Sequence, residues 1–438
     1  MSLYSSMNTA LSGMNAQSRA LGHISDNVAN SQTTGFKRTD TNFVSYVLES
    51  NSETHRPGTV LARPDFTNQI QGTIEQVENP LAMAISGQGF FTTALPVGTN
   101  ADGAKTFDAR NFDTRAGDFN RDHEGYMVNG SGYILQGWPV TDGVVDKTVL
   151  SPILITEDVY TPQQTQDLSL IGNLAAGGTT DQTTSIQVID SLGNSRALQL
   201  TFAPSASTTD NTWTLSITAP EATTTALGSI KILFGQDGAV DQPDGTLAEF
   251  TDASSDAIFG STAADGDPAT VTFEADFGQG AQTMVLNLGI FGTSDGLTQF
   301  ASTGASGFSI NSFQQDGVVI GFFSSVTAQK DGAVRINYDN GQSRVVARVP
   351  VTVFKDPDRL EHLDGQAFLR TTESGEARVV SAGEDGAGLL SIRAVERSNV
   401  DIATEFSKLI LAQRAYSANS KIVTTVDQLM EETLNMRR

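Results

Sequence analysis

The two ends of the chain carry apolar heptad patterns, and no other long helical pattern is evident between them. Apolar side chains spaced alternately by four and three residues predict a helix with one narrow seam. At 1.5 Å per residue this first helix would be roughly 40 Å long. Small polar residues flank its seam, so the helix would be marginal in isolation. The N-terminal seam consists of Leu3, Met7, Ala10, Met14, Gln17, Leu21, Ile24 and Val28, with Leu11 beside it.

The C-terminal end mirrors this pattern. Asn399 and Asp401 are suitable N-cap residues for a second long helix. Two seamed helices at the ends of one chain can pair with each other or with copies of themselves. The alternative, which the pattern alone leaves open, is two ordinary surface helices packed on separate cores. The C-terminal seam consists of Ile402, Phe406, Leu409, Tyr416, Val423, Val426, Met430 and Leu434.

Between the ends, short β-branched runs alternate with turn signals. Residues 185–189, 213–217 and 345–354 predict strands, and Asn-Gly and Asp-Gly pairs recur between such runs. Strands this short with this many turns are typical of sandwiches and barrels. The predicted fold class is therefore mainly β with terminal α-helices. It comprises nested β-sandwich or barrel domains and an inner domain in which the N- and C-terminal helices pair like a coiled coil.

A shift in composition divides the β region. Residues 155–320 are richer in Thr, Ser and Asp-Gly stretches than the segments on either side. This pattern predicts one domain inserted into another, which is tolerated where the host ends lie close together. We expect a helical domain formed by 1–37 plus 398–438 and an extended connector over 38–72. A β domain is expected from 73–154 plus 321–397, with 155–320 inserted as an outer β domain.

Charge and composition exclude several classes of function. The chain has 438 residues with 27 Lys and Arg against 50 Asp and Glu, a formal net charge of −23. A general nucleic-acid binder needs a basic face, so we expect no nucleic acid among the partners. Cysteine is absent, which excludes disulfides, thiolate metal sites and cysteine nucleophiles. Neither an apolar run of membrane-spanning length nor a Sec-type signal is present, so we expect no membrane insertion.

The sequence offers little that resembles enzyme chemistry. Phosphate-loop and zinc-protease motifs are missing, and the four histidines lie far apart. The acidic loop around Asp237, Asp241 and Asp244 lacks the spacing of a calcium-binding loop. We therefore expect no catalytic residues, no metal site and no cofactor.

Five segments together resemble the axial proteins of the bacterial flagellum, the family that contains rod and hook subunits. The first contains the Asn-Val-Ala-Asn and Thr-x-Gly-Phe-Lys run, and Asn27, Asn30, Thr34, Gly35, Phe36 and Lys37 are its motif residues. The large inserted middle segment favours the hook branch over the shorter distal rod branch. The matching segments are 12–37, 84–91, 114–129, 132–138 and 396–421.

The resemblance implies a structural subunit that polymerises into a curved, flexible tube, a universal joint carrying motor torque from rod to filament. The two terminal seams would be its polymerisation interface. Its implied partners are further copies of itself, the distal rod, hook cap and hook-filament junction proteins, the type III export apparatus and the hook-length ruler. It would be exported to the cell exterior without a cleaved signal peptide. A distal rod subunit, or a secreted β-rich adhesin or binding module, remains the alternative.

Overall fold

The computed structural model describes residues 3–50, 55–100, 104–205, 211–236, 242–251, 254, 257–259, 266–301 and 308–435. The chain divides into two compact units. Unit 1 comprises Met1–Thr156, Ser324–Asn337 and Ser343–Arg438, and unit 2 comprises Glu157–Phe323 and Tyr338–Gln342. The terminal helices and the first β region both fall in unit 1. The finer four-part division of the chain stays a prediction.

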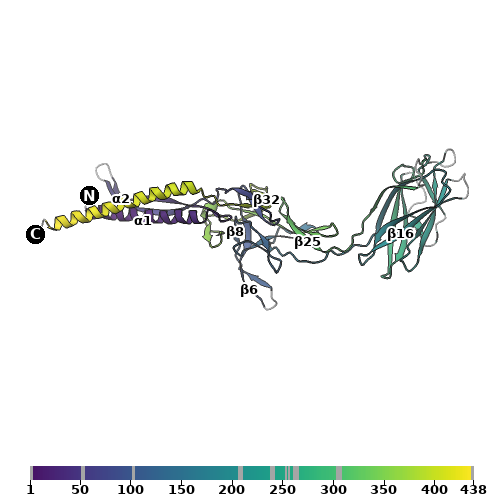
Figure 1. Ribbon diagram of the computed structural model, residues 1–438, viewed down its shortest axis with the longest axis horizontal. Coiled ribbons are helices and arrows are strands. Elements are labelled where there is room, and N and C mark those ends of the chain that lie inside the picture. Colours follow the sequence, from purple (N-terminus) through teal and green to yellow (C-terminus); the bar gives the residue numbers. More distant parts are fainter. Residues whose placement is uncertain are drawn as a thin grey trace. The chain divides into compact units, whose positions relative to one another are not determined.

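Two long helices at the chain ends belong to unit 1. They are α1 (Leu3–Ala29) and α2 (Ile402–Asn435). Figure 1 shows them side by side, with the two chain ends at the same end of the pair. The helices are therefore antiparallel. The predicted fold class, mainly β with paired terminal helices, is confirmed.

The segment expected as an extended connector has a more definite form. Strands β1 (Thr39–Ser50) and β2 (His55–Phe66) form an antiparallel hairpin that packs along α1. Polar residues on the flank of α1 hold it there: Thr9 Oγ donates to Gly58 O at 3.1 Å, and Val60 N donates to Ser12 Oγ at 3.2 Å. The small polar flank of the helix thus serves as a set of hydrogen-bonding partners for strand backbone.

The rest of unit 1 is built around a large, irregular sheet in which distant segments are neighbours. Strand β11 (Ile134–Thr141), from the first half of the chain, pairs with β5 (Phe91–Ala94) and with β27 (Ser343–Arg348) from the second half. The strands of this sheet follow one another in the order β25 (Phe323–Ala328), β26 (Ala333–Tyr338), β27 (Ser343–Arg348), β11 (Ile134–Thr141), β5 (Phe91–Ala94), β8 (Phe112–Thr114), β30 (Ala367–Leu369) and β29 (Glu361–Leu363). Off this path lie β9 (Asn120–Arg121), β10 (Met127–Val128), β12 (Val144–Val145) and β13 (Ser151–Pro152).

Small two-stranded pieces complete unit 1. They pair β3 (Ile74–Gln76) with β33 (Ala394–Glu396), β4 (Met83–Ser86) with β32 (Leu389–Ile392), β6 (Pro96–Thr99) with β7 (Lys105–Phe107), and β28 (Val351–Val353) with β31 (Arg378–Val380). A short 3₁₀ helix, η1, covers Pro357–Arg359. In the first two pairs, residues 74–86 meet residues 389–396, so the start and the end of the β region are joined immediately before α2.

Unit 2 is a sandwich of two sheets. One sheet is β15 (Gln182–Ile189), β16 (Ser195–Pro204), β17 (Thr212–Thr218), β18 (Ala226–Phe234) and β19 (Leu247–Thr251) in sequence order. The other contains β14 (Asp167–Leu174), β20 (Ala257–Phe259), β21 (Pro268–Asp276), β22 (Ala281–Ile290), β23 (Leu297–Thr298) and β24 (Phe308–Gln315). Inward side chains of both sheets form one apolar core around Trp213, Phe202 and Phe273. Clean alternation of buried and outward residues explains why these segments form strands.

The predicted strands over 185–189 and 213–217 lie within β15 and β17. The run 345–354 was expected as one strand, but it is split between β27 and β28. Pro350 lies at the break, and proline has no N–H to donate to a strand ladder. The chain therefore changes partner there, from β26 and β11 to β31.

Candidate functional site

Small side chains are buried on both α1 and α2. Ala10, Ala16 and Ala20 on α1 and Ala412 on α2 are buried. At Gly13 the helices come so close that an added Cβ would lie 2.9 Å from Asn419 Nδ2. The absence of a side chain at Gly13 thus leaves room for the Asn419 side chain of α2. Sequence analysis named Ala10 among its seam residues and missed the burial of Ala16, Ala20 and Ala412.

The predicted large seam residues differ in how far a single chain buries them. Ile24 and Val426 are buried, whereas Met7, Met14, Leu21, Val28, Leu409, Val423 and Met430 are half-buried. Leu11, Ile402, Phe406 and Tyr416 are exposed. The side chains of Leu3 and Leu434 lie outside the described residues. Within one chain, most of the predicted polymerisation residues thus keep apolar surface in contact with solvent.

Further apolar side chains on α2 are exposed beside those predicted. Phe406 is 51% exposed and Leu411 is 66% exposed. Ile410, Ile422 and Leu429 belong to the same set. Monomeric soluble proteins rarely expose so many large apolar side chains on one element, and such surfaces mark interaction sites. Sequence analysis missed Ile410, Leu411, Ile422 and Leu429 because they lie off the heptad pattern.

A buried polar pair fixes how the helices align. Asn27 Nδ2 donates to Glu405 Oε2 at 3.1 Å and to Thr39 O at 3.0 Å, and Asn27 Oδ1 accepts from Thr39 N at 2.9 Å. Lys408 Nζ lies 2.8 Å from Glu405 Oε1 and 2.5 Å from Asp40 Oδ1. Although burial opposes it, the hydrogen bonds to Asp40 and Glu405 raise the pKa of Lys408. The motif residue Asn27 therefore links α1, β1 and α2.

A groove of about 450 Å³ runs beside this polar pair. Its walls come from α1, β1 and α2, with Ala20 and Ile24 facing Leu411, Ala412 and Ala415. Phe43 of the hairpin adds apolar surface, and the polar part of the lining consists of Gln17, Thr39, Asp40, Thr41 and Lys408. Apolar side chains of all three elements thus line one groove, next to the exposed side chains of α2.

A buried ion cluster joins three of the motif segments. Glu396 accepts from Lys37 Nζ at 2.5 Å, from Arg115 Nη1 at 3.0 Å and from Gly72 N at 2.8 Å. The three charged side chains are at most 2% exposed. Lys37 also donates to Ile70 O at 2.7 Å. Burial lowers the pKa of Lys37 to about 8, against the raising effect of Glu396. Sequence analysis missed both Arg115 and Glu396 as partners of the motif residue Lys37.

The turn before Lys37 packs directly on this cluster. The helix α1 ends at Ala29, so the Thr34–Lys37 turn follows the helix rather than capping it. Asn30 donates back to Asp26 at that end, and Thr34 and Phe36 are half-buried. Gly35 has a φ of +71°, and an added Cβ would lie 2.4 Å from Ala116 N. Glycine is required there because the turn has a left-handed backbone pressed against the Arg115 segment.

The sheet of unit 1 also holds an isolated buried carboxyl group. Asp113 on β8 is buried, and Thr92 Oγ donates to its Oδ1 at 3.2 Å. Thr92 in turn contacts Thr352 Oγ on β28 at 2.5 Å. Burial raises the pKa of Asp113 to about 7. The three side chains connect the large sheet to the smaller β28–β31 pair.

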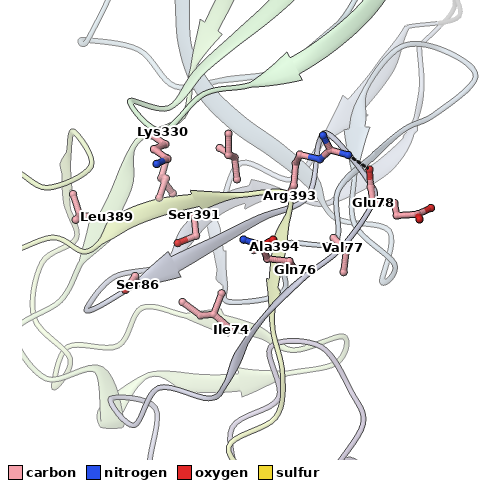
Figure 2. A pocket seen from close by; sticks show the side chains of 12 residues that line it. Ile74, Gln76, Val77, Glu78, Ser86, Lys330, Leu389, Ser391, Arg393 and Ala394 are labelled. Atoms are coloured by element: carbon pink, nitrogen blue, oxygen red, sulfur yellow. Dashed lines mark hydrogen bonds between the residues drawn. The ribbon is translucent and has the colours of Figure 1, made fainter.

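An open groove of about 920 Å³ lies between the β3–β33 and β4–β32 pairs of unit 1 (Figure 2). Arg393, which has a φ of +52°, donates to Glu78 O at 3.4 Å. Lys330 adds a second cation, and Leu389 and Ile74 add apolar surface. Glu78 is the one carboxylate among the lining residues, so the groove does not hold the carboxylate pair of a general acid and base.

Across the described residues, no three or more His, Asp or Glu side chains are grouped as a metal site would need. In the same part of the chain, neither helix is long and apolar enough to cross a membrane. The two features that stand out are therefore structural: a helix pair with exposed apolar surface, and buried ions that connect it to the sheets.

Four family models match successive parts of the chain. A family described as "Flagella basal body rod protein" matches residues 7–37, and "Flagellar basal body rod FlgEFG protein C-terminal" matches 393–436. "Flagellar hook protein FlgE/F/G D1 domain" matches residues 84–173. "Flagellar basal body protein FlaE D2 domain" matches residues 165–318, nearly all of unit 2.

Relatives that match over the full length of both chains are named flagellar hook protein FlgE. The chain is 30% identical to flagellar hook protein FlgE of Brucella abortus and 31% identical to that of Rhizobium meliloti, over 100% of both chains in each case. A crystal structure of Helicobacter pylori flagellar hook protein FlgE2 matches 74% of this chain and 100% of that chain, with 14% identity and a TM-score of 0.46. The predicted role as a structural hook subunit is confirmed by the full-length relatives. The chain belongs to the flagellar hook protein family.

Proposed function

We propose that the chain polymerises through its terminal helices into the tube of the hook, and that the exposed apolar side chains of α2 are covered there by neighbouring copies. The observation that carries this proposal is the exposure of Phe406, Ile410 and Leu411 on one helix. Covering a large apolar side chain stabilises a contact by about 1.5–3 kcal/mol before ordering entropy is subtracted. Many identical contacts along a polymer multiply that gain.

The predicted seam residues fit the same proposal in a modified form. Ile24, Val426 and the small residues pair α1 with α2 inside one chain, whereas Leu11, Ile402, Phe406 and Tyr416 meet other copies. The groove between α1, β1 and α2 offers these copies apolar surface beside polar and charged side chains. In each copy α1 and α2 thus pair with each other, and the exposed apolar side chains are left to bind neighbouring copies.

The assembled tube is proposed to act as a curved, flexible joint that transmits torque from rod to filament. The buried Lys37–Glu396–Arg115 cluster supports this role because it ties both helix connections to the β region. We propose further that the subunit has no enzyme activity and that it leaves the cell by type III export without signal cleavage. The rod, cap, junction and ruler proteins are its proposed partners.

The test is a double variant, Phe406→Gln with Leu411→Gln, purified beside the wild type under polymerising salt. Both residues are largely exposed in the single chain, so the folded monomer should keep its helicity and its unfolding temperature. Negative-stain microscopy should show at least tenfold fewer tubes. The control is Val144→Gln, another exposed apolar residue, which lies on β12 away from the helices. Normal tubes from the double variant would refute the proposal.

A further inference from the structure

Two segments of unit 2 form a narrow ribbon where the chain enters and leaves the sandwich. Residues 160–163 run antiparallel to residues 318–321, and we call the pair the linker ribbon. Tyr160 N donates to Gly321 O at 2.8 Å, and a second bridge follows three residues further along. A two-stranded ribbon is at best marginally stable in water on its own. The linker ribbon therefore needs support from other parts of the chain.

Buried polar side chains fix the end of the linker ribbon that lies next to the sandwich. Thr165 is fully buried, and its Oγ donates to Gln315 Oε1 at 2.7 Å and accepts from Ile189 N at 2.8 Å. Gln282 Nε2 donates to Thr165 O at 2.7 Å. Because Ile189 lies on β15 and Gln282 on β22, these bonds reach both sheets of the sandwich. The linker ribbon is therefore a firm extension of unit 2 at this end.

A second support comes from the tip of the β26–β27 hairpin. Residues 338–342 at this tip belong to unit 2, although the rest of the hairpin belongs to unit 1. Asp339 Oδ1 accepts from Phe322 N, next to the linker ribbon, at 2.7 Å. Asn340 Nδ2 donates to Val319 O, within the ribbon, at 2.8 Å. The tip thus binds the backbone of one ribbon segment at two positions.

Close packing leaves little freedom where the tip meets the ribbon. Gly321 is buried, and an added Cβ would lie 2.5 Å from Asn340 Nδ2. The rings of Tyr160 and Tyr338 meet edge to face, with their centroids 5.2 Å apart. The amide of Asn340 also shapes the tip itself, because its Oδ1 accepts from Gln342 N at 3.0 Å. One side chain therefore holds both its own turn and the ribbon.

We propose that residues 338–342 act as a clip that holds the linker ribbon in one conformation and so restricts the motion of unit 2 relative to unit 1. The chain passes from one unit to the other beside each ribbon segment and again on each side of the tip. Domains joined by unsupported segments move independently by default. With the clip in place, such motion must break the bonds of Asp339 and Asn340. A single chain suffices for this effect, which therefore goes beyond the proposed function; its consequence for a tube, that unit 2 follows unit 1 as the tube turns, rests on the proposed function.

The experiment opens the clip from each side separately. Asn340→Asp keeps the shape of the side chain but replaces the amide donor beside Val319 O with a carboxylate, which only accepts hydrogen bonds. Asn311→Asp, at an exposed position of β24, is the matched control. Gly321→Ala acts from the ribbon, because its methyl group must displace the Asn340 amide.

Two measurements on the unassembled chain report the state of the clip. Because the chain has no cysteine, a dye can be attached to unit 2 through Gln279→Cys, in the exposed turn between β21 and β22. The decay of its fluorescence anisotropy shows whether unit 2 rotates with the whole chain or by itself. Hydrogen exchange followed by mass spectrometry reports the amide of Phe322, which donates to Asp339. Fluorescence of the buried Trp138 and Trp213 reports whether each unit stays folded.

We expect Asn340→Asp and Gly321→Ala to shorten the rotational correlation time of the dye by roughly twofold and to speed exchange at Phe322 by roughly tenfold, because local opening no longer has to break the clip. Asn311→Asp should match the wild type in both measurements. Wild-type rotation and exchange in both folded clip variants would overturn the inference, as would independent rotation of unit 2 in the wild type. Failure of the wild-type chain to restore hooks in a hook-deficient strain would instead refute the proposed function.

Discussion

Replacing Glu396 with Gln should destabilise unit 1 by about 3–5 kcal/mol, the usual cost of removing one partner from a buried ion pair. The carboxylate is almost fully buried and accepts from Lys37 Nζ, Arg115 Nη1 and Gly72 N. Hydrogen bonds to charged groups each contribute about 1.5–3 kcal/mol. Glutamine has the same shape, so no cavity opens. Its amide oxygen retains part of the hydrogen bonding, but two buried cations lose their counter-charge.

The two tryptophans of the chain make this measurable in each unit separately. Trp138 is buried in unit 1 and Trp213 in unit 2. In a Trp213→Phe background, unfolding by urea or by heat, followed by the fluorescence of Trp138, reports unit 1 alone. At roughly 2–4 °C per kcal/mol for a unit of this size, the thermal midpoint should fall by roughly 6–20 °C. The variant stays folded at low temperature if unit 1 has the usual stability of about 5–15 kcal/mol.

A nearby exposed pair is the matched control. Arg397 Nε lies 2.5 Å from Glu75 Oε2, but these side chains are 38% and 53% exposed. Glu75→Gln should therefore destabilise unit 1 far less than Glu396→Gln does. Adding Lys37→Met to Glu396→Gln should recover part of the loss, because it removes one unpaired buried cation. The reasoning fails if Glu396→Gln and Glu75→Gln destabilise the protein equally.

Two further predictions concern pH and helix packing. Burial raises the pKa of Asp113 to about 7, so the folded chain holds a proton that the unfolded chain releases above its ordinary value of 3.8. The unfolding free energy of unit 1 should then fall as pH rises from about 4 to 7, by at most roughly 4 kcal/mol. Asp113→Asn should abolish that slope in urea titrations at several pH values, and an unchanged slope would assign it to other groups. Gly13→Leu should force α1 and α2 apart at Asn419. We expect loss of polymerisation and of helical circular dichroism, with Trp213 fluorescence of unit 2 unchanged, and intact tubes would show that close helix approach is not needed.

The apolar periodicity of the sequence predicted the helices and strands better than it predicted which surfaces cover them. The strands around Trp213 and Ile186 alternate cleanly, and both ends of the chain form the long helices expected from their apolar patterns. A heptad seam shows that a helix has an apolar face, but it does not show which molecule covers that face. Leu11 and Phe406 are as apolar as any core residue, and they are exposed in the single chain.

The ion cluster lay beyond sequence reasoning for a different reason. Arg115 and Glu396 meet across 281 positions, and Lys37 and Glu396 across 359. No local period relates charges at such separations. The available signal was chemical context: Arg115 precedes Ala116 and Gly117, and Lys37 follows Gly35 and Phe36. Charges next to small and aromatic residues are candidates for burial, but their partners follow only from the fold.

Polar and apolar contacts have different roles in this subunit. Inside the chain, few large apolar residues join the two helices, and specific polar contacts such as Asn27 to Glu405 set their alignment. A buried polar pair tolerates one register, because a shift leaves its members without partners. Large apolar side chains tolerate many arrangements, since dispersion and burial are not directional. Fixed internal contacts with adaptable external ones are what a subunit requires if it must keep its own shape while its neighbours move in a bending tube.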